Sequence, residues 1–351
     1  MFPETFAAKW IERLTEPGEL VLDPFSGRGT TALVAILAGR KSIAFDVNDV
    51  AFCLTKAKTQ PPALDKLRRR LGDLRRSFNT TKWPINIPVA DAFFQAAFSP
   101  RTLSQLLFLR NRLRWKESRV DCMIAALVLG SLHGESQTSS SYLSNQMPRT
   151  ISTKPAYSVR FWKRHRLVAP DRDVFEIVCA RAAYRYESPL PTGRSMIFHA
   201  DMRKLPQVAG KWRESVKCVI TSPPYLDVTN FEEDQWLRLW FLGGPPYPTT
   251  NRLSRDDRYS GRSQYWAFVA DMWRSLGAAL APKAHVVIRM GSRLESSAKL
   301  RTALNGVSSV SGRKVALVSS TVSQIRNRQT PSFHPGTKGC LVETDFHFYV
   351  H

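Results

Sequence analysis

Five consecutive residues, Thr221-Ser-Pro-Pro-Tyr225, bring a hydroxyl, two prolines and an aromatic ring together directly after an apolar stretch. Proline lacks a backbone N–H and has a fixed φ, so this segment is rigid and offers carbonyl acceptors. The Ser222 hydroxyl and the Pro223 carbonyl can hold the two hydrogens of a planar amine and turn its lone pair toward an electrophile. Tyr225 can stack on the amine's ring. The predicted catalytic residues are Ser222, Pro223, Pro224 and Tyr225, and a turn that only ends a strand is the alternative.

A second motif, Asp23-Pro-Phe-Ser-Gly-Arg-Gly-Thr-Thr31, lies between an expected strand and an expected helix. Its glycines would let the backbone approach a ligand that a Cβ would exclude, and it lacks the Lys of a phosphate-binding loop. The acidic residue that opens the turn suits an ammonium group better than a pyrophosphate. Asp46, at the end of the next expected strand, can accept hydrogen bonds from ribose hydroxyls. A plain turn at the glycines and a helix N-cap at Asp46 are the alternatives.

Taken together, the two motifs resemble the cofactor and catalytic motifs of the bacterial DNA amino-methyltransferases, particularly those that modify cytosine at N4. The resemblance covers residues 2–58 and 196–351 and implies S-adenosylmethionine as methyl donor, with no metal. It also implies that an N-terminal stretch such as residues 2–6 lines the methionine end of the cofactor and that Asp201 meets its adenine. The expected cofactor-binding residues are Phe2, Thr5, Asp23, Pro24, Phe25, Ser26, Gly27, Gly29, Thr30, Thr31, Asp46, Asn48, Asp201 and Met202.

Around these motifs, apolar runs and helical patterns alternate, which predicts an α/β fold with a parallel sheet. The resemblance implies a Rossmann-like, seven-stranded methyltransferase sheet with a C-terminal β-hairpin. Expected strands are residues 19–25, 41–45, 196–200, 218–221 and 285–290, with 314–321 and 340–350 as the hairpin. Expected helices are residues 30–37, 50–58, 64–76, 103–115, 120–133 and 264–280.

Residues 60–195 interrupt the alternation and predict a large, basic, mainly helical insert. They carry 23 Lys or Arg against 10 Asp or Glu, which is +13 of the chain's net charge of +22. Such an excess is typical of proteins that contact phosphates, and a ribosomal or membrane-surface partner would suit the same charge. We predict that residues 1–59 and 196–351 form the methyltransferase domain and that 60–195 bind DNA and recognise the target. The predicted DNA-binding residues are Arg149, Lys154, Tyr157, Arg160, Lys163 and Arg164, with a solvated basic loop as the alternative.

The composition narrows the class of protein. No apolar run reaches the roughly 18 residues of a membrane span. The five cysteines have no C-x-x-C spacing, and His165, His199 and His334 have no metal-ligand spacing. The first residues lack the basic and apolar regions of a secretory signal, so we expect a cytoplasmic, nucleoid-associated protein.

The sequence therefore predicts an enzyme that transfers a methyl group to the N4 amino group of a cytosine flipped out of double-stranded DNA. N6 of adenine or an RNA base is the nearest alternative acceptor. A nucleic-acid-binding module without catalytic activity is the alternative from another class. By resemblance alone, a cognate restriction endonuclease is the expected partner.

Overall fold

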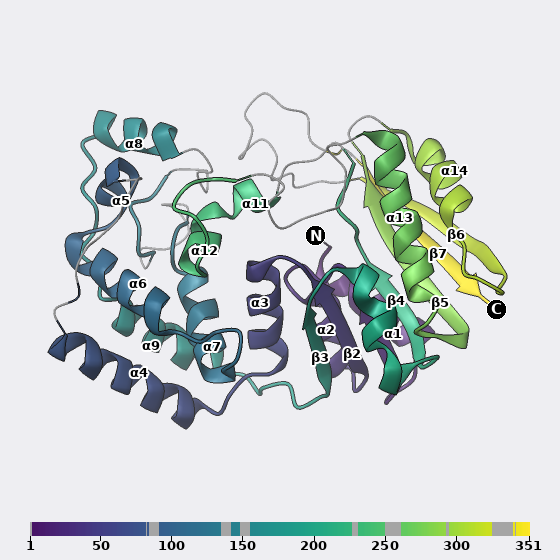
Figure 1. The fold of residues 1–351 in the computed structure, drawn as a ribbon, viewed down its shortest axis with the longest axis horizontal. Coiled ribbons are helices and arrows are strands. Elements are labelled where there is room, and N and C mark those ends of the chain that lie inside the picture. The colour runs from purple at the N-terminus through teal and green to yellow at the C-terminus, as the bar shows by residue number, and fades with distance from the viewer. Residues whose placement is uncertain are drawn as a thin grey trace.

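A seven-stranded mixed sheet lies at the centre of the computed structural model, which describes residues 2–81, 83, 91–134, 142–147, 155–226, 231–249, 261–292, 295–324, 340 and 342–351 (Figure 1). The strands are β1 (Leu20–Asp23), β2 (Lys41–Asp46), β3 (Ser195–His199), β4 (Val216–Thr221), β5 (Leu280–Gly291), β6 (Val315–Gln324) and β7 (Val342–Val350). Their order is β3-β2-β1-β4-β5-β7-β6. Pairing is parallel from β3 to β5, and β7 runs antiparallel to β5 and β6. The predicted Rossmann-like sheet with a C-terminal hairpin is confirmed.

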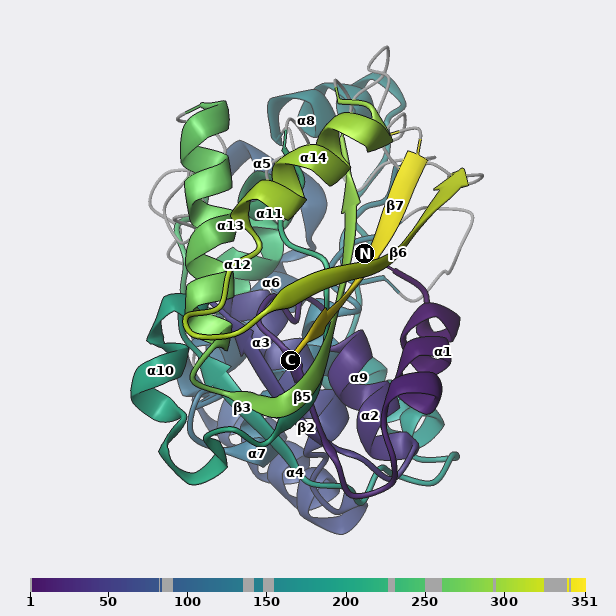
Figure 2. The ribbon, with the colours of Figure 1, turned by 90° about the vertical axis from the view of Figure 1, so that its right-hand side faces the viewer.

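Helices cover both faces of the sheet, which is why its central strands are apolar runs. One face carries α1 (Glu4–Leu14) and α2 (Thr30–Leu37), and the other carries α13 (Arg262–Leu276) and α14 (Ser297–Val307) (Figure 2). On β1, Val21 packs into the cluster beneath α1 and α2, whereas Leu20 and Leu22 pack into the cluster beneath α13. This is the two-residue alternation that a strand imposes.

Most predicted helices are present with shifted ends. α2 has the predicted bounds, and α3 (Asp49–Thr59) is one residue longer at each end. α13 ends at Leu276, four residues before the predicted end, because Gly277 follows and the chain enters β5 at Leu280. The remaining differences are at α4 (Leu64–Thr80), which is longer, and at α6 (Pro100–Arg112) and α7 (Arg119–Leu129), which end earlier.

The described part of residues 60–195 folds into α4, α6, α7 and three further helices, α5 (Asp91–Ala97), α8 (Pro155–Arg164) and α9 (Val174–Arg185), as the predicted mainly helical insert requires. Between β3 and α13 lie short helices: η1 (Met202–Lys204), α10 (Leu205–Val208), η2 (Gly210–Trp212), α11 (Phe231–Asp234) and α12 (Trp236–Phe241). The insert shares one apolar core with α3 and α12, in which Phe52, Phe94, Leu106 and Trp240 are all buried. The insert therefore packs on residues that precede it and follow it in the chain.

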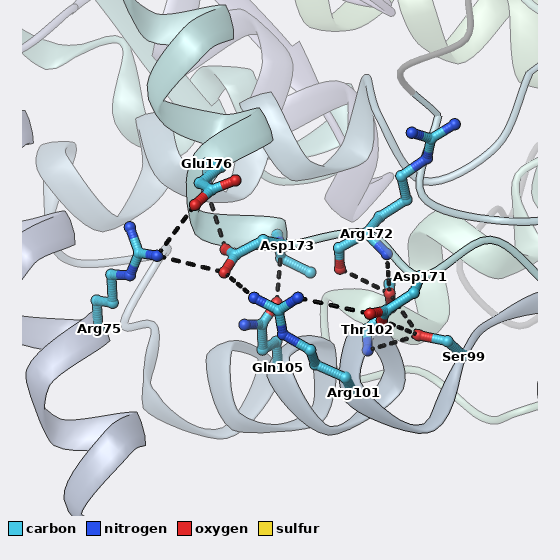
Figure 3. Close-up of polar contacts among 10 residues, drawn as sticks. Arg75, Ser99, Arg101, Thr102, Gln105, Asp171, Arg172, Asp173 and Glu176 are labelled. Atoms are coloured by element: carbon cyan, nitrogen blue, oxygen red, sulfur yellow. Dashed lines mark hydrogen bonds and ion pairs between the residues drawn. The ribbon is translucent and has the colours of Figure 1, made fainter.

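A buried carboxylate joins three helices of the insert (Figure 3). Asp173 caps α9 by accepting the backbone N–H of Glu176 at 3.1 Å. Its Oδ2 also accepts from Arg101 of α6 at 2.6 Å and from Arg75 of α4 at 3.4 Å. Beside it, the Gln105 side chain of α6 accepts the backbone N–H of Val174 at 2.7 Å. One side chain thus satisfies a helix terminus and pairs with two arginines at once.

The parallel strands all end at the same edge of the sheet, which is the upper edge in Figure 1. The basic helix α8 lies at this upper end of the molecule. In contrast, α4 lies at the opposite, lower end, because α3 runs down from the carboxyl end of β2 and leads into it. Ligands bind at this edge in open α/β folds. Of the two basic helices, α8 therefore lies at the ligand-binding end of the molecule and α4 at the opposite end.

Candidate active site

The loop between β1 and α2 contains the two predicted cofactor glycines, both with left-handed backbone: φ is 52° at Gly27 and 75° at Gly29. A Cβ on Gly29 would lie 2.7 Å from Oγ1 of Thr55, so that position has no room for a side chain. The loop is held to the end of β2, since Ser26 donates its backbone N–H to the Phe45 carbonyl at 2.9 Å. The backbone of this loop consequently has no Cβ at the two glycines and is held in place, so a ligand can approach it closely.

Asp23, the last residue of β1, is buried and joins the two sequence motifs. Its Oδ1 accepts the hydroxyl of Thr221 at 2.7 Å and the backbone N–H of Phe25 at 3.1 Å. Thr221 ends β4, the parallel neighbour of β1. The bond therefore joins the two strand ends that carry the glycine loop (residues 24–29) and the proline loop (residues 222–225). Burial raises the pKa of Asp23 from 3.8 to about 6, against the opposing effect of these hydrogen bonds.

Asp46, the last residue of β2, holds the glycine loop from the other side. Its Oδ2 accepts the backbone N–H of Gly27 at 2.8 Å, and its Oδ1 accepts that of Asn48 at 2.9 Å. Burial raises its pKa to about 6, and the nearby charge of Asp23 adds to the rise. The helix cap that we considered for Asp46 belongs to Asn48, whose side chain accepts the N–H groups of Val50 and Ala51. Each oxygen of Asp46 keeps a second lone pair for a ligand.

Two observations test whether this loop suits a polar, cationic ligand. The Ser26 hydroxyl is buried, and within the part of the chain that the structure describes it has no hydrogen-bond partner. A buried hydroxyl without a partner is unfavourable unless a bound molecule supplies one. In addition, a positive charge beside Asp23 and Asp46 would stabilise both carboxylates in their ionised form. These residues fit a cofactor that carries an ammonium group and a sulfonium.

The other predicted cofactor residues surround the same edge. Asp201 follows β3, and its Oδ1 accepts the backbone N–H of Arg203 at 2.8 Å. The neighbouring Ala200 N–H reaches the Asp46 carbonyl at 3.1 Å, which brings Asp201 next to the end of β2. Of the remainder, Pro24, Thr31 and Met202 are buried, Phe2, Phe25 and Thr30 are half-buried, and Thr5 is exposed. Thr31 donates its hydroxyl to the Ile220 carbonyl of β4 at 3.2 Å.

The proline loop leaves β4 beside this site. Ser222 and Tyr225 are half-buried, and Pro223 is buried. The Pro224 carbonyl accepts the Tyr265 hydroxyl of α13 at 2.9 Å, and the Tyr225 hydroxyl donates to Oε1 of Glu343 on β7 at 2.8 Å. Burial raises the pKa of Tyr225, and the charge of Glu343 adds to the rise, so this phenol is neutral at physiological pH. Tyr265 and Glu343 thereby hold the loop from α13 and β7.

The predicted DNA-binding residues divide into two groups. Tyr157, Arg160, Lys163 and Arg164 lie on α8, and all four side chains are exposed. Arg149 and Lys154 lie outside the described residues. The four described side chains are open to a partner at the end of the molecule where the strands end (Figure 1).

Three residues that contact the proline loop or its partners were not predicted: Tyr265, Glu343 and Arg289. A sequence signal for two of them exists. Glu343 and Asp345 share one face of β7, and two acids in that position need a cation from a neighbouring strand. Arg289 on β5 supplies it, and β5 pairs Arg289 with Asp345 in register. Without the strand pairing, the sequence does not identify which cation this is.

Comparison with known proteins gives a local match at the N-terminus. Residues 1–56 match the N6_N4_Mtase family, described as DNA methylase. This segment resembles a DNA methylase. The DNA adenine methyltransferase YhdJ of Escherichia coli (strain K12) is 46% identical over 46 residues, which cover 13% of this chain and 16% of that protein. The match thus supports a DNA amino-methyltransferase family for a part of the chain that includes the glycine loop.

Solved structures with a similar arrangement are distant in sequence. TrmN from Thermus thermophilus is 14% identical with a TM-score of 0.37, and the match covers 99% of this chain and 48% of TrmN. The rRNA methyltransferase aviRa from Streptomyces viridochromogenes is 13% identical with a TM-score of 0.33, covering 98% of this chain and 84% of aviRa.

Two features are absent from the described residues. None of their helices is both long and apolar enough to cross a membrane. Nor do three or more His, Cys, Asp or Glu side chains gather there in a group that could hold a metal ion.

Proposed function

We propose that this chain is an S-adenosylmethionine-dependent methyltransferase that modifies the exocyclic amino group of a base in double-stranded DNA, with N4 of cytosine as the acceptor. The hydrogen bond between Asp23 and Thr221 carries the proposal. It holds the glycine loop and the proline loop together at the carboxyl ends of β1 and β4, where the strand order reverses. Ligands of α/β sheets bind at such a reversal, so a cofactor on one loop meets a base on the other.

In this proposal the glycine loop holds the cofactor. Asp23 faces its ammonium group, Asp46 accepts from its ribose hydroxyls, and Asp201 meets its adenine. Gly27 and Gly29 allow the close backbone approach, and the buried Ser26 hydroxyl gains a partner. When bound, the cofactor supplies a methyl group on a positively charged sulfur.

The proline loop receives the base, which must leave the duplex because a stacked and paired amino group cannot be attacked in line. The Ser222 hydroxyl and the Pro223 carbonyl accept the two amino hydrogens and turn the nitrogen lone pair toward the methyl group. Tyr225 stacks on the base. The nitrogen would form its new bond to the methyl carbon as the bond between that carbon and the donor sulfur breaks, with the electron pair left on sulfur. The nitrogen would then lose one proton to solvent.

The insert, residues 60–195, contacts the DNA in this proposal, with the exposed cations of α8 on phosphates and Tyr157 beside an unstacked base. Host protection next to a cognate restriction endonuclease in the cytoplasm is the corresponding biology. DNA from cells that express the protein would then resist digestion at the methylated sequence.

The test is the product. Purified protein is incubated with unmethylated plasmid DNA and S-adenosylmethionine carrying a deuterated methyl group, and the nucleosides are analysed by mass spectrometry. We expect deuterated N4-methylcytosine from the wild type. Ser222→Ala should keep its affinity for cofactor and DNA and lose rate in the methyl-transfer step, because the hydroxyl is needed most when the amine becomes pyramidal. A ring-carbon methyl, or a wild-type rate in Ser222→Ala, would contradict the mechanism.

N6 of adenine is the second candidate, because the relative that is 46% identical over its short match is named a DNA adenine methyltransferase. Both acceptors are planar amines, so the same loop can serve either. Deuterated N6-methyladenine in the same assay would establish this alternative. A chain that binds DNA but not S-adenosylmethionine would instead be a binding module without catalytic activity.

A further inference from the structure

The hydroxyl of Tyr225 ends in a network of charged residues that no step of the proposed reaction uses. Glu343 accepts this hydroxyl with Oε1 at 2.8 Å, and its Oε2 lies 3.4 Å from Nη1 of Arg289. Arg289 is buried and also makes two hydrogen bonds to Asp345, at 2.6 and 2.9 Å. Its guanidinium lies 3.9 Å from the ring centre of Phe6 on α1. The phenol is thus connected to β5, β7 and the N-terminal helix.

The surrounding backbone restricts the same ring. A Cβ on Gly291 would lie 3.0 Å from Cε2 of Tyr225, so the tyrosine edge packs directly against the backbone at the end of β5. Gly291 pairs with Glu343 across the β5–β7 ladder, two residues along from the pair Arg289 and Asp345. One ladder therefore fixes the backbone at the edge of the ring, the carboxylate at its hydroxyl, and the cation behind that carboxylate.

Stacking on a base uses the face of an aromatic ring and does not need a hydroxyl. The phenol, which is hydrogen-bonded to Glu343 and also interacts with the Ser222 side chain, therefore serves another purpose, and the geometry indicates orientation. A ring that is already oriented loses less conformational freedom when a base arrives. Arg289 and Asp345 keep the carboxylate in place, because a bidentate arginine pair holds the guanidinium in one position.

We propose that Glu343 is a positioning residue that acts through the Tyr225 hydroxyl and sets the ring plane against which the extruded base stacks. This inference rests on the proposed function, since it assigns a base to Tyr225. Arg289 serves as the fixed counter-charge of Glu343. If Glu343 were only a structural partner of Arg289, its effect on catalysis would not depend on the phenol.

A double-mutant cycle separates these two roles. Tyr225→Phe removes only the hydroxyl, and Glu343→Gln removes the charge while keeping a similar shape. Single-turnover methyl transfer is measured on unmethylated plasmid DNA with tritiated S-adenosylmethionine for the wild type, both single variants and the double variant. We expect each single variant to be slower by about tenfold or more, as expected for loss of a hydrogen bond to a charged group. The double variant should be no slower than the slower single variant.

Three controls accompany the cycle. Tyr349→Phe, at the other end of β7, should transfer methyl groups at the wild-type rate. Affinity for S-adenosylmethionine should stay within about twofold of the wild type in every variant, and the thermal midpoint should distinguish folded from misfolded protein. A double variant whose loss equals the product of the two single losses would overturn the proposal, as would a wild-type rate in Tyr225→Phe.

A second measurement does not depend on turnover. Protein carrying ¹³C at the tyrosine ε carbons is observed by NMR, and the signal missing in Tyr225→Phe assigns Tyr225. We expect Glu343→Gln to shift and sharpen this signal as the ring gains motion, and Tyr349→Phe to leave it unchanged. An unmoved Tyr225 signal would overturn the positioning role even if the DNA is methylated. Absence of methylated base in the wild type would instead reject the proposed function.

Discussion

At the residue scale, two carboxylates lie beside one loop of the candidate site: Asp23 is buried and Asp46 is half-buried. The free protein holds Asp23 and Asp46 with pKa values raised from 3.8 to about 6, in each case mainly by burial. An acid whose pKa is higher in the folded state than in the unfolded state stabilises the fold below its unfolded pKa. That stability is lost as the pH rises through the folded pKa. The free protein therefore loses stability between about pH 4 and pH 6 from these two groups.

Replacing Asp23 by Asn should separate stability from binding. Asparagine keeps an oxygen for the Thr221 hydroxyl and the Phe25 N–H but removes the buried charge. We expect the thermal midpoint of the ligand-free protein to rise at pH 8 and to depend less on pH between 4 and 6. The affinity for S-adenosylmethionine should fall by roughly 1.5 to 3 kcal/mol. Scanning fluorimetry and calorimetry would measure both, and a lower midpoint at pH 8 would show that the charge stabilises the free fold.

The same effect predicts how binding depends on pH. A cationic ligand favours the ionised carboxylates, so the wild-type affinity for S-adenosylmethionine should weaken as the pH falls below about 6. Asp23→Asn should show a shallower decline, because one of the two titrating groups is gone. Equal pH profiles for the two proteins would remove Asp23 from the cofactor site.

Substituting the two loop glycines by alanine separates the cost of a left-handed backbone from the cost of steric overlap. Both have positive φ, but a Cβ would meet Thr55 at 2.7 Å from Gly29 and nothing nearer than 4.0 Å from Gly27. Gly27→Ala should cost about 1 to 2 kcal/mol of unfolding free energy from its left-handed backbone alone. Gly29→Ala should cost at least about 1 kcal/mol more, because overpacking adds to the strain. Urea unfolding of both variants measures the difference, and equal losses would mean that Thr55 moves aside freely.

Sequence reasoning brought the two motifs together but did not find how they are held. The spacing of Asp23 and Thr221 along the chain, 198 residues, gives no indication of the hydrogen bond between them. The resemblance to a family provided that juxtaposition. The partners of the proline loop, Tyr265 and Glu343, depend on strand pairing and helix packing, which only the fold determines. The type of Tyr265 alone did not distinguish it from other polar residues of α13, and the two acids of β7 indicated only that a neighbouring cation was needed.

At the scale of elements, two basic helices of the insert lie at opposite ends of the molecule. α8 presents Arg160, Lys163 and Arg164 at the end where the strands terminate, and α4 presents exposed Lys66, Arg68 and Arg69 at the other end (Figure 1). Charge reversal of the three α8 cations should flatten the dependence of DNA affinity on salt, because fewer counterions are released. Reversal of the three α4 cations changes the net charge equally and should leave the slope nearly unchanged.

Fluorescence anisotropy with a duplex at several salt concentrations would compare the two triple variants. Equal flattening by both would mean that net charge, rather than the position of α8, controls binding. A flatter slope only in the α4 variant would move the DNA to the other end of the molecule.

The contacts of Asp173 with Arg75, Arg101 and Glu176 stabilise the insert, so we expect substitution of Asp173 to lower its stability (Figure 3). Asp173→Ala removes a helix cap and the partner of Arg101 and Arg75, so we expect a loss of about 2 to 3 kcal/mol in unfolding free energy. The two arginines are partly exposed and regain water, which keeps the loss below that of a fully buried pair. Glu176→Ala, in the exposed pair with Arg75, should lose less than about 1 kcal/mol. Similar losses for both would contradict the cap at Asp173.

Elements with strong patterns were predictable and weaker ones were not. The five parallel strands follow from apolar runs and turn residues, and the two hairpin strands follow from the β-rich runs near the C-terminus. α1 was not predicted, although Phe6, Ala7, Trp10 and Ile11 form a buried stripe at helical spacing. α14 was also not predicted, although Leu300, Leu304 and Val307 recur at helical spacing and pack on the core beneath it.

At the scale of the whole molecule, the sheet supplies a rigid edge and the insert supplies basic surface at its side. One apolar core extends from α3 through the insert helices to α12. The sheet domain and the insert are therefore joined by side-chain packing as well as by the two connecting segments of the chain. Phe52 and Cys53 of α3 and Trp240 of α12 are buried within it. Removing residues 60–195 would therefore expose a large apolar surface on the sheet domain.

In the proposed function, where the insert recognises the DNA target, this shared core also constrains how the recognised sequence can change in evolution. Recombination that exchanges only the insert between two relatives would join helices to an α3 face and an α12 that were selected for different neighbours. Such chimaeras would have poorly packed side chains in the core and would be less stable, which opposes selection for a new specificity. Divergence through point substitutions on exposed α8 positions leaves that core untouched. Under that proposal, substitutions at exposed α8 positions can change the target without disturbing the core, whereas exchange of the whole insert disturbs it.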